Sequence, residues 1–356
     1  MIQDIDGLKT SPASLDVCPV CESDCLLQQP YVEGLGHREF DDLDVMICQR
    51  CGHGWVDKVF APSVLDHYYA EIYRSERSSA FFDYEKGTPN PVELRSLGQM
   101  ILCRQFLSTQ QNIKILDVGA GPGNSYLAAK RCFPESEVFF LEKSPKAAAY
   151  YKKHFNVVVI EDLTTLDQKF DLIIMSHSLE HFHSSDTRNF ILSLEEALTD
   201  EGLLFIEVPN NDFRLPSHCN GIERLNDTPH LQFFSGDSLR KTVEGLCGLQ
   251  IEYLNSSGRF LDSSMPVNIT DLRDKAKVDV KNTDHSKIRA GFLGKVLVLI
   301  RRTLAAIGVL DRVYFAYHFL VKNGFADDEF SYGGNRHTLR VVARKHSPVK
   351  SESDLL

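Results

Sequence analysis

Two groups of residues in this 356-residue chain have types and spacings suited to chemistry. The first is a glycine-rich turn at Gly119, Gly121 and Gly123, which follows the short apolar segment 113–118. Glycine has no Cβ, so the backbone of such a turn can approach a ligand closely. A helix that starts after the turn points its free N–H groups at the same place. The segment therefore predicts a buried parallel strand, a turn and a helix that bind a nucleotide-type cofactor.

The second group is four cysteines in two C-x-x-C pairs, namely Cys18, Cys21, Cys48 and Cys51. Two such pairs place four thiolates on tight turns that can close a tetrahedron around Zn²⁺. Cys25 and His53 are alternative ligands, and free buried thiols or a redox pair are alternative interpretations of the same pattern. The segment 26–47 between the pairs is long enough for a β-hairpin. The sequence thus predicts an N-terminal zinc ribbon with a structural metal.

The spacing of the glycines selects the kind of cofactor. A dinucleotide fingerprint, G-x-G-x-x-G, requires a third glycine at position 124, where Asn124 stands. The spacing present, Asp117-x-Gly119-x-Gly121-x-Gly123, resembles the first motif of class I S-adenosylmethionine-dependent methyltransferases. Acidic residues at the ends of the next two expected strands, and the segment 177–182 after the fourth, agree with that family.

The resemblance implies that cofactor-binding residues lie at consecutive strand ends. Asp117 and the glycine turn are expected at the methionine portion, and Asp162 with Leu163 at the adenine. A carboxylate at position 142 is suited to accept hydrogen bonds from both ribose hydroxyls. The expected set is Asp117, Gly119, Ala120, Gly121, Gly123, Glu142, Lys143, Asp162, Leu163, Ser176, His177 and His181.

Composition bounds the class of protein. The length suits about two domains, and a net charge of −10 argues against a nucleic-acid substrate held on a basic surface. The N-terminus lacks the pattern of a signal peptide. The most apolar long segment, 291–310, contains Lys295, Arg301 and Arg302, which are too costly near a bilayer centre for a transmembrane span. We expect a cytoplasmic protein with reduced thiols.

The expected fold is α/β, with a Rossmann-like seven-stranded class I methyltransferase core, an N-terminal zinc ribbon and a helical insertion near the C-terminus. The expected parts are the zinc ribbon 1–60, a tyrosine-rich bridge and docking helix 61–111, the cofactor-binding core 112–255, a helical and loop insertion 256–335, and the last core strand with a polar tail 336–356. The insertion contains a basic amphipathic segment over 287–307. It is predicted either to pack against the core or to lie peripherally on an acidic membrane.

The whole arrangement resembles a methyltransferase subgroup with an N-terminal zinc-binding domain, a class I core and a C-terminal extension. This subgroup includes sugar C-methyltransferases that act on nucleotide-linked deoxysugars. The resemblance covers the cysteine pairs, the turn 51–53, Tyr68-Tyr69 and the segment 230–235, and it departs over 255–335. It implies a small polar acceptor, most of all a nucleotide-linked sugar or another glycan precursor.

Methyl transfer to a hydroxyl, an amine or an enolisable carbon needs a base for the departing proton. We interpret His230 as that base, with His177 as the runner-up for this role and a second residue of the same pocket. The alternative for His230 is a surface or capping histidine. Glu180 and His181 recur in the wider family whatever the acceptor, which favours a structural or cofactor-wall role. The expected substrate pocket also includes Tyr69, Tyr73 and Asn210.

Other functions stay open at this stage. One is a zinc-ribbon interaction protein whose core binds the cofactor without turnover, and another is a methyltransferase for a non-sugar metabolite. Enzymes that methylate proteins or RNA are disfavoured by the acidic charge and by the lack of a basic aromatic patch. The acceptor atom and the oligomeric state do not follow from the sequence.

Overall fold

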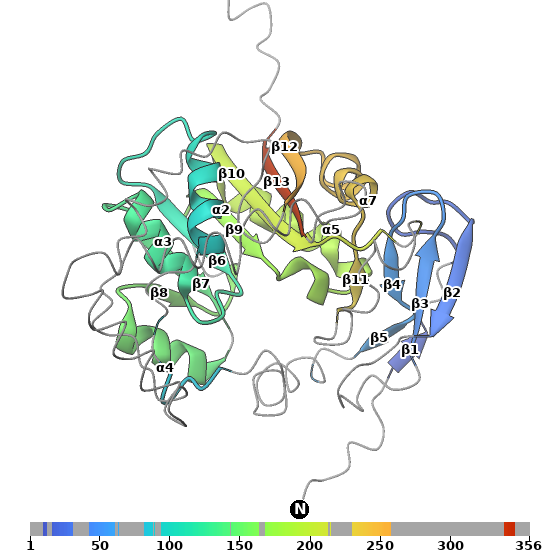
Figure 1. The fold of residues 1–356 in the computed structure, drawn as a ribbon, viewed down its shortest axis with the longest axis horizontal. Helices are drawn as coiled ribbons and strands as arrows, with labels where there is room; N and C mark the ends of the chain where they lie inside the picture. Colours follow the sequence, from blue (N-terminus) through green and yellow to red (C-terminus); the bar gives the residue numbers. More distant parts are fainter. Residues whose placement is uncertain are drawn as a thin grey trace, which may run out of the picture.

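The computed structural model shows an α/β core with a small β module beside it (Figure 1). It describes residues 10–12, 16–30, 43–60, 63, 82–87, 89, 94–142, 144–163, 168–212, 214, 230–257 and 338–345. Several predictions fall outside these ranges: Tyr69, Tyr73, Lys143, the insertion from residue 258 to 335 and its amphipathic segment.

Seven strands form the core sheet in the order β12-β13-β10-β9-β6-β7-β8. β13 is antiparallel to both of its neighbours, and the other pairs are parallel. The strands are β6 (Lys114–Val118), β7 (Glu137–Leu141), β8 (Val158–Ile160), β9 (Phe170–Ser176), β10 (Leu198–Pro209), β12 (Gln250–Ser257) and β13 (Thr338–Arg344). The predicted Rossmann-like fold with a seven-stranded sheet is confirmed.

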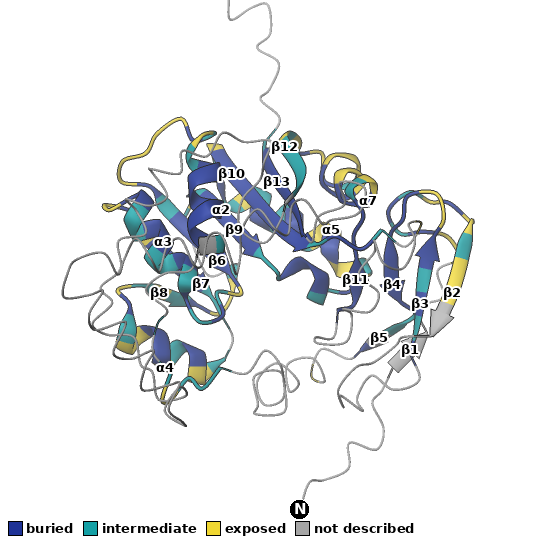
Figure 2. Cartoon of the chain, viewed as in Figure 1, coloured by how far each residue is buried: buried dark blue, intermediate teal, exposed yellow. Residues whose placement is uncertain are grey.

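The sheet is buried on both faces because its strands carry apolar side chains on each side (Figure 2). In β6, Ile115 belongs to one core cluster and Leu116 to the other, as the two-residue period of a strand requires. The first cluster includes Phe140 and Phe205, and the second includes Ile173. A strand covered on both faces carries apolar residues at consecutive positions, as Ile115 and Leu116 do, which explains why segment 113–118 predicted it correctly.

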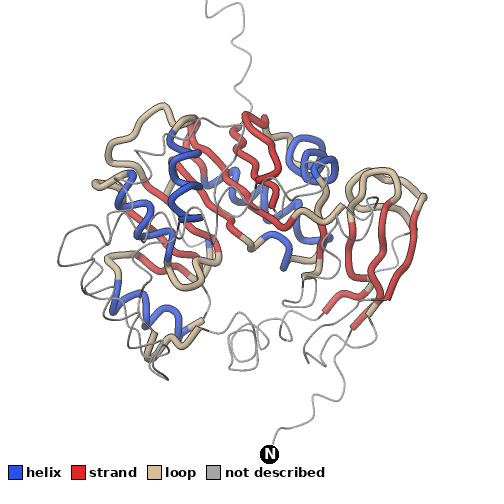
Figure 3. The backbone as a smooth tube through the Cα atoms, viewed as in Figure 1, coloured by secondary structure: helices blue, strands red, loops and turns tan. Residues whose placement is uncertain are grey.

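The helices flank this sheet (Figure 3). They are α2 (Leu94–Arg104), α3 (Asn124–Cys132), α4 (Pro145–His154), α5 (Ser184–Ala197) and α7 (Gly236–Arg240), with a 3₁₀ turn at Leu179–His181 and a π turn at Lys241–Leu246. The sequence predicts helices over 124–132 and 145–154, and α3 and α4 have these bounds. The sequence also predicts a helix over 235–247, and the structure has one over 236–246 whose second half is π-helical. The fifth strand, predicted from residue 202, begins at 198.

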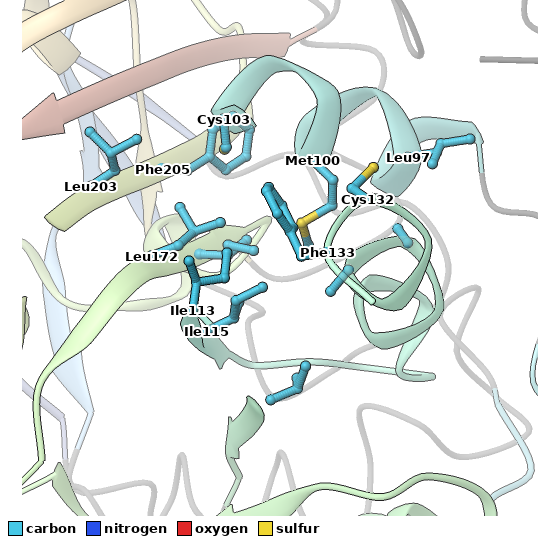
Figure 4. Close-up of a cluster of buried hydrophobic side chains, with 14 of the residues drawn as sticks. Leu97, Met100, Cys103, Ile113, Ile115, Cys132, Phe133, Leu172, Leu203 and Phe205 are labelled. Carbon is cyan, nitrogen blue, oxygen red and sulfur yellow. The ribbon is translucent and has the colours of Figure 1, made fainter. Parts of the chain in front are cut away.

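α2 packs against the core, as expected of the docking helix. Its Leu97 and Met100 lie in the same buried cluster as Phe133 and Ile115 (Figure 4). α2 therefore covers one face of the sheet, although it precedes residue 112, where the cofactor-binding core is expected to begin. No helix among the described residues is both long and apolar enough to cross a membrane.

The N-terminal module contains a four-stranded sheet in the order β11-β4-β3-β2. Three of its strands are N-terminal: β2 (Leu26–Pro30), β3 (Asp44–Cys48) and β4 (Gly54–Val56). The predicted hairpin between the cysteine pairs is formed by β2 and β3. The fourth strand, β11 (Gln232–Phe233), belongs to the segment between β10 and α7 of the core and was not predicted. A two-stranded sheet of β1 (Thr10–Pro12) and β5 (Lys58–Phe60) completes the module.

Candidate functional site

The glycine turn after β6 requires glycine at the predicted positions. Gly119, Gly121 and Gly123 have φ of 76°, 55° and 78°, in the left-handed region that side chains disfavour. A Cβ on Gly119 would lie 2.8 Å from Oγ of Ser178, and a Cβ on Gly123 would overlap the ring of Phe155. Backbone conformation and close packing thus both fix the residue type here.

Two tyrosines hold this turn in place. The hydroxyls of Tyr84 and Tyr151 both donate to the carbonyl oxygen of Gly121, at 3.2 and 2.6 Å. The Tyr151 hydroxyl also lies 3.4 Å from Oε2 of Glu142. Oε1 of Glu142 accepts from the backbone N–H of Ser144 at 2.9 Å. The half-buried Glu142 carboxylate is therefore oriented beside the turn while keeping lone pairs for a ligand.

The other predicted cofactor residues lie at the same edge of the sheet. Asp117 is buried and accepts a short hydrogen bond from the Ser125 hydroxyl. Burial raises the pKa of Asp117 to about 7, and the nearby charge of Glu142 adds to this effect. Asp162 is exposed and Leu163 half-buried, just after β8.

The parallel strands β8, β7, β6 and β9 are neighbours in this order, so their carboxyl ends form one continuous edge. Along it follow Asp162, Glu142, the glycine turn and Ser176. Ser176 accepts a hydrogen bond from the side-chain amide of Gln99 at 2.8 Å. The chemistry of these donors and acceptors fits an adenine, a ribose and an amino acid carboxylate or amine in succession.

Further along this edge, three histidines surround one buried carboxylate. Glu180, 1% exposed, lies in the 3₁₀ turn; its Oε1 is 3.2 Å from Nδ1 of His177 and 3.9 Å from Nε2 of His230. The rings of His181 and His230 meet with centroids 5.1 Å apart. His230 is 9% exposed, so the structure excludes the alternative of a surface histidine. The predicted base and its companion His177 are brought together.

The charges around this cluster set the protonation of its members. Burial lowers the pKa of His230 to about 3, and the positive charges of His181 and His177 add to this against the attraction of Glu180. Burial also acts against a charged His177, but hydrogen bonds to Glu180 and Glu207 raise the pKa of His177 above its usual value. The neighbouring imidazole of His177 keeps the pKa of Glu180 low, at about 2, despite its burial.

A second buried carboxylate completes the cluster, and it was missed by the sequence analysis. Glu207, on β10, lies 3.3 Å from Nε2 of His177 and 2.5 Å from Nε of Arg340 on β13. Arg95 on α2 lies 3.8 Å away on the exposed side. An acid and an arginine inside two apolar strands are a signal that could have found this pair. Burial raises the pKa of Glu207, but Arg340, His177 and Arg95 together lower it below its usual value.

The histidine cluster and the cofactor turn are in direct contact. His177 has φ of 54°, a strained conformation for a residue other than glycine that costs about 1–3 kcal/mol. The next residue, Ser178, donates from Oγ to the carbonyl of Val118 at 2.6 Å and packs against Gly119. The predicted pocket residue Asn210 is buried nearby and bridges to Phe234.

The four predicted metal ligands also come together. The Sγ atoms of Cys18, Cys21, Cys48 and Cys51 lie within 4.8 Å of one another. Cys18 and Cys51 are 3.7 Å apart between sulfurs, and Cys21 and Cys48 are 3.5 Å apart. A zinc ion with sulfurs at about 2.3 Å requires sulfur–sulfur distances of about 3.8 Å, whereas a disulfide requires about 2 Å. The thiol arrangement therefore fits a tetrahedral metal.

The two cysteine pairs have the same backbone geometry. In each, the carbonyl of the first cysteine accepts from the residue after the second: Glu22 N to Cys18 O at 2.9 Å, and Gly52 N to Cys48 O at 2.8 Å. Both of these donor residues have positive φ. Cys25 is exposed and His53 is buried, and neither belongs to the group of four sulfurs among the described residues.

A second group could also hold a cation: ligand atoms of Glu180, His181 and His230 lie within 4.8 Å of one another. In this group, however, Glu180 already contacts His177. A carboxylate shared by three imidazoles is equally an arrangement for moving protons.

Comparison with known proteins identifies the core. Residues 95–252 match a family model described as a methyltransferase domain. The chain thus carries a methyltransferase domain, which confirms the predicted enzyme class. No curated protein matches the chain.

Several solved structures are similar at low identity. The plantazolicin methyltransferase BamL, in complex with a triazolic desmethylPZN analog and SAH, covers 80% of this chain and 95% of its own, with 13% identity and a TM-score of 0.46. Coclaurine N-methyltransferase, bound to N-methylheliamine and SAH, covers 80% and 86%, with 13% identity and a TM-score of 0.40. The cyclopropane synthase MmaA2 from Mycobacterium tuberculosis covers 69% and 83%, with 15% identity and a TM-score of 0.41.

Proposed function

We propose that this protein transfers the methyl group of S-adenosylmethionine to a small polar acceptor, with a nucleotide-linked sugar or another glycan precursor as the acceptor class. The observation that carries the proposal is the cluster of three histidines and two buried carboxylates beside the glycine turn. Methyl transfer to a hydroxyl, an amine or an enolisable carbon requires a proton-accepting group close to the bound cofactor.

The cofactor supplies a methyl group on a positively charged sulfur. The residues of this chain would hold it and align the acceptor. The glycine turn and Asp117 would contact the methionine portion, and the Glu142 carboxylate the two ribose hydroxyls. Asp162 and Leu163 would contact the adenine, since β8 lies at the outer end of the strand order.

His230 would accept the acceptor's proton. Burial lowers its pKa, so the imidazole is neutral near pH 7 and its lone pair is available, although the same burial weakens it as a base. The imidazolium that forms lies 3.9 Å from the Glu180 carboxylate, which stabilises the new charge. His177, tied to Glu180 and Glu207, would keep both carboxylates in position and line the same pocket.

A sugar acceptor is supported by the polar lining of this region. Histidines, carboxylates and the buried Asn210 offer hydrogen-bonding partners for several hydroxyls on one ring. The resemblance in the segment 230–235 points to the same class. Tyr69 and Tyr73 keep their proposed role as covering side chains with flat amphipathic surfaces.

The proposal includes one Zn²⁺ held by Cys18, Cys21, Cys48 and Cys51 as a closed structural site. It also includes a cytoplasmic location, where these thiols stay reduced. Metal analysis of protein purified without chelator should give one zinc per chain. A second equivalent of bound metal would place a cation at Glu180, His181 and His230 and would argue against His230 as a base. Protein without zinc would overturn the zinc ribbon.

The test of the function uses the full-length protein and methyl-labelled S-adenosylmethionine. Candidate acceptors are nucleotide-linked deoxysugars, and phenolic and amine metabolites serve as comparison. We expect labelled sugar and S-adenosylhomocysteine as products. Turnover confined to the phenols or amines would reject the sugar class. Cofactor binding by calorimetry without turnover of any acceptor would favour the non-catalytic alternative.

A further inference from the structure

Gln232, in the two-residue strand β11, links the N-terminal module to the turn that carries Glu180. Its backbone pairs with Trp55 in β4 of the N-terminal module. Beside it, the carbonyl of Leu231 accepts from Val56 N at 3.0 Å. Gln232 is 1% exposed, so its side-chain amide must find its partners inside the protein.

Those partners surround the turn that carries Glu180. Nε2 of Gln232 lies 2.8 Å from the carbonyl oxygen of Phe182 and 2.6 Å from Oγ1 of Thr187, and the carbonyl of Leu179 is 3.5 Å away. The Thr187 hydroxyl itself donates to the carbonyl of His183, so it accepts from Gln232. Both N–H donors of the amide are therefore used on the segment just after Glu180 and His181.

Backbone bonds reinforce the same connection. The N–H of Leu231 donates to the carbonyl of Glu180 at 2.8 Å, which places the preceding residue, His230, beside the carboxylate. On the other side, the Ser235 hydroxyl donates to the carbonyl of Cys51 at 2.5 Å. The segment 230–235 is thus attached at one end to the histidine cluster and at the other to a cysteine pair.

Two further contacts join the module to this region. The ring of His53 packs against Phe234 with centroids 5.2 Å apart. The N–H of Phe60 donates to Nε2 of His183 at 3.0 Å. The carbonyl of Gly121 in the glycine turn, in contrast, is held by the hydroxyls of Tyr84 and Tyr151, which lie outside this region.

We propose that Gln232 is a positioning residue that couples the N-terminal metal ribbon to the histidine–carboxylate cluster, so that the intact ribbon sets the place of His230. The role in turnover rests on the proposed function, whereas the coupling itself does not. Loss of the folded ribbon should therefore displace His230 and lower turnover, while the affinity for the cofactor is kept.

The first test is Gln232→Leu in the full-length protein, which keeps the strand pairing and removes both side-chain hydrogen bonds. Hydrogen exchange by mass spectrometry should show roughly tenfold or faster exchange in peptides covering 177–183 and 230–235, with little change over 113–123. Affinity for S-adenosylmethionine, measured by calorimetry, should stay within about twofold while turnover falls. The matched control is Gln250→Leu, the same change at an exposed position of β12, which should alter none of these.

The second test starts from the ribbon. Removing bound metal with a chelator should speed exchange over 230–235 and 177–183 as well as in the ribbon itself. Ser235→Ala is a milder change, which can be used if Gln232→Leu fails to fold. It should speed exchange in the same peptides, but by a smaller factor. Unchanged exchange over 177–183 after metal removal and in Ser235→Ala would overturn the coupling. Since exchange needs no acceptor, a failed activity assay leaves this result interpretable and bears only on the proposed function.

Discussion

The two halves of the candidate site lie along one sheet edge but are built differently. The cofactor half uses the ends of β8, β7 and β6, all within residues 117–163. The acceptor half brings together the 3₁₀ turn, Glu207 on β10, Arg340 on β13 and the segment 230–235. One half depends on short local segments and the other on contacts between distant parts of the chain.

The halves also differ in how they treat charge. In the acceptor half, Glu180, Glu207 and Arg340 are all buried. The negative charge of Glu207 is paired with Arg340, and that of Glu180 lies beside His177. Removing one member of such a buried pair leaves an uncompensated charge, at a cost of about 3–5 kcal/mol. The cofactor half holds Asp117 with a raised pKa and leaves Asp162 exposed. The acceptor half is therefore the less tolerant of substitution.

The largest expected effect is on turnover in the acceptor half. His230→Ala should lower the turnover number by about 10²–10⁴-fold because the base is removed. Affinity for S-adenosylmethionine should be unchanged by calorimetry. His154→Ala, at the end of α4 (Pro145–His154), removes an imidazole far along the chain and serves as the control. A fall of less than tenfold would remove His230 from the role of base, and a loss of cofactor affinity would make its role structural.

The next effect belongs to the cofactor half. Glu142→Ala should weaken binding of S-adenosylmethionine by about 2–3 kcal/mol, the scale for losing charge-assisted hydrogen bonds. The control is Glu137→Ala, an exposed acid at the opposite end of the same strand. Calorimetry should separate the two variants clearly. Equal affinities would reject the ribose contact.

The third expected effect is on the pH dependence of stability in the cofactor-free protein. The folded pKa of Asp117, about 7, is above its ordinary 3.8, so its contribution is full below pH 3.8 and is lost as pH rises through 7. The folded pKa of His230, about 3, is below its ordinary 6.5, so its contribution is present above pH 6.5 and is lost as pH falls toward 3. The two halves thus have opposite signs.

Urea unfolding of variants between pH 4 and 8 would measure these contributions. Relative to the unmodified protein, the stability of Asp117→Asn should improve as pH rises to 7, and that of His230→Ala should improve as pH falls. Curves that stay parallel to the unmodified protein at every pH would show that neither group titrates as the structure indicates.

The difference between the halves also explains what could be predicted from the sequence. The glycine spacing and the apolar run before the turn are local, so they predicted β6, its turn and the start of α3. The contacts of the turn and of the acid at 142 with a cofactor stay a prediction. The cysteine pairs predicted the sulfur cluster for the same reason. Glu207 and Arg340 lie far apart in sequence and meet through strand register, which one sequence does not give. Gln232 was missed because a two-residue strand has no periodicity.

The pairing of Trp55 with Gln232 also affects how the protein is made. During synthesis the cysteine pairs leave the ribosome long before residue 232, and N-terminal parts of a chain tend to fold first. Until then β4 exposes an unpaired strand edge, the kind of surface through which newly made chains associate wrongly. The four-stranded sheet of the N-terminal module can therefore be completed only after most of the methyltransferase domain has been translated.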